Sequence, residues 1–145
     1  MKKGISLLLA VLLLTMGAFT VSAATPPELS EYIPGETPIE NFMYTSSTST
    51  SISITSSGVV TGNASIIGYQ GITTSVDIFL YIQQYKNGAW TTIGSWYKYT
   101  AAYYGGLQGQ MSVPKGYSYR IKASYYANCG SSWENIISYS PTRSY

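Results

Sequence analysis

Residues 117–127 read YSYRIKASYYA, and this stretch decides the fold class. Every second residue from Tyr117 to Tyr125 is aromatic or apolar, and serine, arginine or lysine stands between them. A period of two is typical of a β-strand with one dry face and one wet face. Tyrosine suits such a strand, because its ring packs on a pleated surface while its hydroxyl finds a polar partner.

Similar short segments, separated by turn residues, fill the chain from residue 44 onward, and no helical period lies between them. This pattern predicts an all-β domain, an antiparallel β-sandwich of about seven strands. The strongest apolar stripe runs from Val76 to Ile82, with Phe79, Tyr81 and Tyr85 on the opposite face. The expected strands cover residues 48–55, 60–68, 76–85, 89–100, 107–113, 117–127 and 133–139.

Two local signals refine the connections between these strands. Asn87-Gly88 is a favoured dipeptide for a type I′ hairpin, because both residues tolerate a positive φ. In the following strand, Trp90, Ile93 and Trp96 break the period of two, which indicates a bulge near Gly94. Residues 101–106 are expected to form a loop.

The segment GYSYRIKA at residues 116–123 resembles the sixth strand of immunoglobulin-like and fibronectin type III-like sandwiches. In those folds a tyrosine hydroxyl bonds the backbone of the preceding turn, and Tyr117 or Tyr119 would fill that role. The resemblance also implies a core tryptophan, matched by Trp96 or Trp90. No cysteine pair accompanies it, because Cys129 is the only cysteine.

The N-terminus predicts a signal peptide over residues 1–23. Lys2 and Lys3 precede a short apolar run, and small residues lead to a cleavage point before Ala24. The apolar run is too short to span a bilayer, so we expect a secreted protein with no membrane contact after cleavage. Residues 24–43 have the acidic, proline-rich composition of a linker, and residues 44–145 form the predicted β-sandwich domain.

Charge and composition exclude several function classes. Lys2 and Lys3 account for the formal net charge of +2, and the remaining bases and acids balance. The bases of the domain are scattered rather than clustered, so nucleic acid is not an expected partner.

The sequence predicts a protein that is not an enzyme. It has no histidine, the commonest general base and metal ligand, and a single cysteine forms no zinc cluster. Asp77 and Glu134 are the only carboxylates of the domain, and both are interpreted as solvated strand residues. We expect no cofactor and no metal.

The tyrosines divide into two groups. Tyr117, Tyr119, Tyr125 and Tyr139 are expected in the core. The remaining candidates have no obvious core role, and such rings can stack on sugars or form a rigid contact patch for a protein, although cross-strand aromatic pairs also stabilise sheets. The candidate binding residues are Tyr97, Tyr99, Tyr103, Tyr104 and Tyr126.

Three further segments carry a closer resemblance: ISITSSGVV, IQQYKNGAWTTIGSW and VPKGYSYRIKASYYA. Together with the leader they resemble a family of short secreted proteins of unknown function from Gram-positive bacteria. The predicted function is that of a secreted, non-enzymatic module that binds cell-wall or host glycan, or a surface protein. The alternatives are a bacteriocin-like antagonist and a self-assembling structural surface protein.

Overall fold

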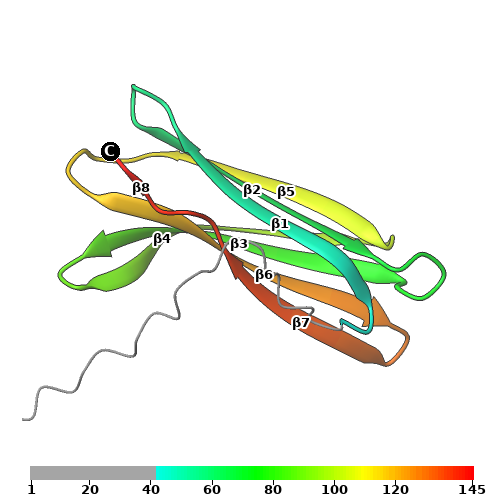
Figure 1. Cartoon of the computed structure of the whole chain (residues 1–145). Coiled ribbons are helices and arrows are strands. Elements are labelled where there is room, and N and C mark those ends of the chain that lie inside the picture. The colour runs from blue at the N-terminus through cyan, green and yellow to red at the C-terminus, as the bar shows by residue number, and fades with distance from the viewer. Residues whose placement is uncertain (1–41) are drawn as a thin grey trace, which may run out of the picture. The chain divides into compact units, whose positions relative to one another are not determined.

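Two antiparallel sheets face each other across a shared core in residues 42–145, the part of the chain that this computed structural model describes (Figure 1). The all-β sandwich expected from the sequence is confirmed. The smaller sheet has the order β1-β2-β5, formed by Thr45–Ile54, Val59–Gly68 and Tyr104–Ser112. The larger sheet has the order β4-β3-β6-β7, formed by Ala89–Thr100, Ser75–Lys86, Ser118–Cys129 and Ser132–Tyr139, and β8 (Arg143–Ser144) also pairs with β6.

The seven predicted strands are confirmed, but β1 begins three residues earlier than expected, at Thr45, and β6 ends two residues later, at Cys129. Two further differences concern β5 and β8. β5 begins at Tyr104, inside the expected loop, because Tyr104 and Gly105 already pair with Ile67 and Ile66 of β2. β8 was not expected, since its two residues are too few to show an alternating pattern. It returns along the start of β6, where Arg143 pairs with Tyr119.

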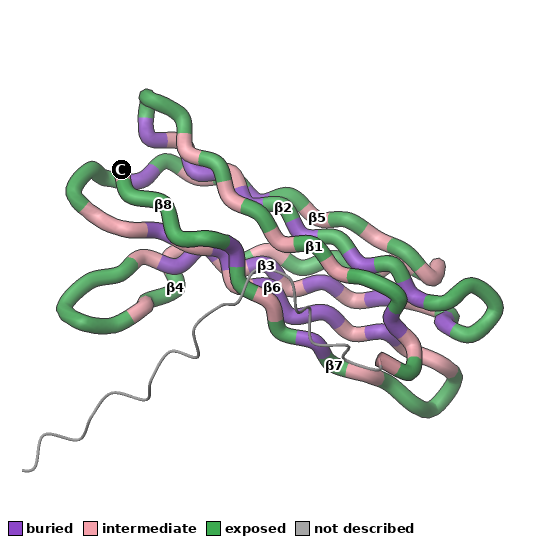
Figure 2. Tube along the Cα trace, in the orientation of Figure 1, coloured by how far each residue is buried: buried purple, intermediate pink, exposed green. Residues whose placement is uncertain are grey.

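The core lies between the sheets and is built from the alternate residues that the sequence indicated (Figure 2). The stripe from Val76 to Ile82 is fully buried, and so are five residues of β6. Tyr139 corrects the expected core, whereas Tyr117 packs against the edge of the core. Tyr117 precedes β6 and is half-buried, and Tyr139 lies on the outer face of β7 with 48% of its surface exposed. The fully buried residues of β6 are Tyr119, Ile121, Ala123, Tyr125 and Ala127.

The two buried tyrosines are held by their hydroxyls. The Tyr119 hydroxyl donates to the carbonyl of Pro114 at 2.6 Å, which ties β6 to the preceding turn, as the sequence predicted for Tyr117 or Tyr119. The Tyr125 side chain reaches the smaller sheet, where its hydroxyl donates to the carbonyl of Ser49 at 2.7 Å. Burial raises the pKa of Tyr125, because a phenolate would lose its hydration there. Both bonds satisfy groups that would otherwise be costly to bury.

The predicted hairpin and bulge are also confirmed. Asn87 and Gly88 have φ values of 54° and 79° and join β3 to β4. Gly94 pairs with Ile82, whereas Thr92 pairs with Gln83, so Ile93 is the extra residue of a bulge. Because of this bulge, Trp96 faces the core, whereas Trp90 of the same strand faces the outer side of the sheet.

Residues 1–41 lie outside the described part of the chain, and with them the predicted signal peptide and nearly all of the predicted linker. Phe42 packs against the core. The Glu134 carboxylate accepts hydrogen bonds from the backbone amides of Met43 and Tyr44 at 2.9 and 3.2 Å, which anchors the start of β1. Among residues 42–145 no helix is long and apolar enough to cross a membrane.

Candidate functional site

A row of four aromatic rings crosses the outer face of the larger sheet. The fully buried stripe of β3 leaves Phe79 pointing outward, and strand pairing places Tyr97 of β4 opposite it. On the other side, the Phe79 ring lies 5.9 Å from that of Tyr126, which lies 5.7 Å from Trp133 of β7. The Phe79 and Tyr97 ring centroids are 4.7 Å apart. Because one ring comes from each of four strands, the row spans about 14 Å.

The two ends of this row are the open part. Tyr97 and Trp133 are 56% and 62% exposed, whereas Phe79 and Tyr126 are half-buried between them. Tyr99, two residues along β4 from Tyr97, adds a ring that is 55% exposed. Aromatic side chains exposed together on one face are unusual in a soluble domain and mark interaction surfaces.

Polar groups hold the row in place. The Tyr97 hydroxyl donates to Asp77 Oδ1 at 2.6 Å, and Asn128 Nδ2 donates to Asp77 Oδ2 at 3.0 Å. The hydrogen bond to Asp77 raises the pKa of Tyr97, with smaller contributions from lost hydration and from the carboxylate charge. Asp77 therefore orients the ring at one end of the row.

A second aromatic group lies on the same outer face, around Arg120 of β6. The guanidinium carbon is 4.2 Å from the ring centroid of Trp90 and 4.4 Å from that of Tyr139. Arg120 Nε donates to Gln83 Oε1 at 2.9 Å, so the guanidinium is fixed between the two rings. We call the row and this group the aromatic face, formed by Phe79, Tyr97, Tyr99, Tyr126, Trp133, Trp90, Arg120 and Tyr139.

The structure separates the five candidate tyrosines. Tyr97, Tyr99 and Tyr126 lie together on the aromatic face. Tyr103 and Tyr104 lie on the smaller sheet instead, at the start of β5, where their ring centroids are 5.1 Å apart. The candidates therefore belong to two surfaces rather than to one site.

Sequence reasoning missed the β7 and Arg120 contributions to the aromatic face. Trp133, Ile137 and Tyr139 share one face of β7 and are all exposed, while Ile136 points into the core. The sequence did show that these residues share one face, because the odd-numbered positions of this strand carry the larger side chains. An edge strand with apolar residues on both faces does not reveal which face is inward.

The outer face of the smaller sheet has a different chemistry. Its outward positions on β1 are serines, and those on β2 and β5 include amide side chains. Two amide–side-chain hydrogen bonds link the strands: Gln108 Nε2 to Asn63 Oδ1 at 2.9 Å, and Gln110 Nε2 to Thr61 Oγ1 at 2.8 Å. We call this surface the hydroxyl–amide face.

The two carboxylates of the domain do not meet. Asp77 points outward from β3, whereas Glu134 lies on the opposite side of the sheet and binds the backbone before β1. Within residues 42–145, no three side chains of His, Cys, Asp or Glu come together as metal ligands. Cys129 is a free, half-buried cysteine at the end of β6.

Comparison of the chain with protein-family models, with curated proteins and with solved structures gives no match. The functional argument therefore rests on the residues of the two outer faces.

Proposed function

We propose that this protein is a secreted, non-enzymatic module that binds glycan at a bacterial surface through the aromatic face. The observation that supports the proposal is the row of four rings across β4, β3, β6 and β7, with Tyr97 and Trp133 exposed at its ends. The core lies on the other side of the same strands, so the exposed rings at the ends of the row do not contribute to it.

Sugar rings fit the chemistry of this surface. A pyranose presents C–H groups on one side and hydroxyls around its rim, so it gains both from an aromatic plane and from nearby hydrogen-bonding groups. The aromatic face supplies both, because Asn135 is the strand partner of Tyr126 and Arg120 lies between Trp90 and Tyr139. A narrow row of rings with polar neighbours suits an extended glycan chain better than the broad apolar centre of a protein interface.

The test is retention of the purified protein on insoluble Gram-positive cell wall and on immobilised glycans. The Tyr97→Ala/Trp133→Ala variant removes the exposed ends of the row, and Ser51→Ala/Ser53→Ala on the opposite face is the matched control. We expect the control and the parent protein to be retained and the aromatic variant to be lost. If the parent protein is not retained, or the aromatic variant is retained equally well, the proposal is wrong.

We further propose a fibronectin type III-like architecture and membership of the family of secreted Gram-positive proteins that the sequence resembles. In support, β4 pairs with β3 rather than with β5, and the Tyr119 hydroxyl bonds the turn before β6. Detection of the protein in culture medium, cleaved before Ala24, would support secretion. Its retention inside the cell with residues 1–23 intact would contradict it.

Self-assembly at a surface is the second candidate function, and the exposed edge of the smaller sheet favours it. β1 has ten residues, carries neither charge nor proline, and pairs with another strand on one side only. Such an edge can pair with a second chain unless the protein protects it. Light scattering that shows only monomer over a wide range of concentrations would exclude this candidate.

A further inference from the structure

We propose a second ligand site, for a neutral saccharide, in a trough on the hydroxyl–amide face. Strand pairing sets Ser49, Ser65 and Gly106 side by side across β1, β2 and β5. The trough is this row of small residues, bounded by the Ile67–Tyr104 pair on one side and by the Asn63–Gln108 pair on the other. Larger side chains stand in both neighbouring rows, so the sheet surface is hollowed along the row of small residues.

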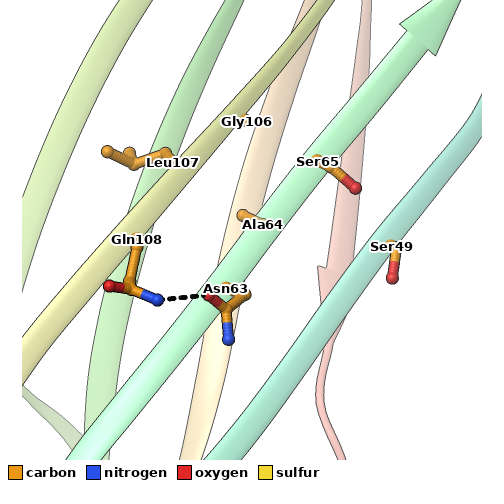
Figure 3. Close-up of a pocket in the computed structure, with 7 residues that line it drawn as sticks. All are labelled: Ser49, Asn63, Ala64, Ser65, Gly106, Leu107 and Gln108. Carbon is orange, nitrogen blue, oxygen red and sulfur yellow. Dashed lines mark hydrogen bonds between the residues drawn. The ribbon is translucent and has the colours of Figure 1, made fainter.

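The two walls of the trough differ in chemistry. Tyr104 pairs with Ile67 on one side, and both are exposed. On the other side Gln108 pairs with Asn63, and their amides are hydrogen-bonded (Figure 3). Two hollows, of about 360 and 550 Å³, share Ser65 and Gly106 as lining residues. The two hollows adjoin at these residues, both are open to solvent, and each lies in the size range of small-molecule sites.

The depression exists at Gly106 because glycine has no side chain to fill it. A Cβ placed there would meet only the carbonyl oxygen of Ala64, at 3.8 Å, within a 4 Å radius. Gly106 is not among the glycines with positive φ, so the strand backbone does not require glycine at this position. A side chain at residue 106 would therefore fill the trough without disturbing the fold.

The lining defines the ligand class. None of the residues that line the two hollows carries a charge, and the Lys98 ammonium beside them is already bound to the Gly106 carbonyl oxygen at 3.0 Å, so the lining favours a neutral ligand. Tyr104, 56% exposed, offers a ring for an apolar sugar face. The Asn63–Gln108 bond leaves Asn63 Nδ2 free to donate and Gln108 Oε1 free to accept, next to the hydroxyls of Ser49 and Ser65. A ring with one apolar face and several hydroxyls satisfies all of these groups.

The experiment is titration of the ¹⁵N-labelled protein with glucose, galactose, mannose and N-acetylglucosamine, followed by amide NMR spectra. We expect saturable shifts at Asn63, Ser65, Gly106 and Gln108 with at least one of these sugars. Gly106→Val should weaken that sugar at least tenfold, because it fills the trough. Ser53→Val, which also places a valine on this face but outside the trough, should leave the affinity unchanged.

The site is independent of the aromatic face, and the same titration separates the two. Trp133→Ala should leave sugar binding in the trough intact, even if it abolishes retention on cell wall. The inference is overturned if no tested sugar gives saturable shifts at the trough residues, or if Gly106→Val binds as tightly as the parent protein. Thermal unfolding of Gly106→Val establishes that the variant is folded.

Discussion

The two outer faces of the sandwich are built on the same β-strand alternation and yet carry opposite chemistry. The larger sheet exposes rings and a guanidinium, while the smaller sheet exposes serine hydroxyls and amides. Both inner faces meet at one apolar core. The smaller sheet adds exposed Tyr104 and Ile67 at one end of its outer face. Because the core is the same for both sheets, burial between the sheets does not explain why the row of rings lies on the larger sheet.

Part of the aromatic face stabilises the fold, and part of it does not. Phe79 and Tyr126 are half-buried against neighbouring rings, so they contribute as cross-strand pairs. Tyr97 and Trp133 leave more than half of their surface in solvent. The comparison therefore separates a structural centre from exposed ends that we propose bind glycan, and the predictions below test that separation.

The largest effect should come from the centre of the row. Phe79→Ala removes the ring that contacts both Tyr97 and Tyr126. It should lower the free energy of unfolding by about 2 kcal/mol, less than for a fully buried phenylalanine. Asn63→Ala, an outward residue of the central strand of the smaller sheet, should change it by less than about 0.5 kcal/mol. Urea unfolding measures both, and equal losses would contradict the difference between the faces.

The ends of the row should matter for binding rather than for stability. Trp133→Ala alone should weaken glycan binding about tenfold, which corresponds to about 1.4 kcal/mol. Its unfolding free energy should fall by less than about 1 kcal/mol, because the ring is mostly exposed. Affinity electrophoresis and urea unfolding give the two values. If Trp133→Ala unfolds easily but binds glycan normally, the ring serves stability rather than binding, and the proposal for this residue is wrong.

The Asp77–Tyr97 contact should appear in the titration of Tyr97. Asp77→Asn removes the carboxylate and should lower the pKa of Tyr97 toward its ordinary value of 10.0. The raised pKa favours the neutral phenol in the folded protein, so its stabilising effect is present below pH 10 and is lost as the pH rises through the raised value. NMR of the tyrosine ring carbons measures the shift, and an unchanged pKa in Asp77→Asn would show that the contact is absent in solution.

The smallest effects should come from the serines of β1. Ser51→Ala/Ser53→Ala should change the unfolding free energy by less than about 0.5 kcal/mol, because both side chains are exposed. Glycan retention should also be unchanged. A loss of retention in this variant would move the binding surface to the smaller sheet.

The sequence predicted most of the architecture, because alternation fixes which residues of a central strand are buried. The predictions of β3 and β6 were correct for this reason. The hairpin at Asn87-Gly88 was predicted because both residues tolerate a positive φ. β8 could not be predicted, since its pairing with β6 depends on the fold being complete.

The candidate site was predicted only in part. Tyr97, Tyr99 and Tyr126 share a face because of strand register, which a single sequence does not reveal. The register also brings Trp133 to Tyr126 and places Arg120 between Trp90 and Tyr139. Tyr103 and Tyr104, close to Tyr99 in the chain, belong to the other sheet, because the chain crosses between the sheets after β4.

The most direct test of the aromatic face is amide NMR mapping of the protein with soluble cell-wall glycan chains. The account predicts that the largest chemical-shift changes fall on the outward residues of β3, β4, β6 and β7 around Phe79, Tyr97, Tyr126 and Trp133. Spectra that do not change, or that change only on β1, β2 and β5, would contradict it.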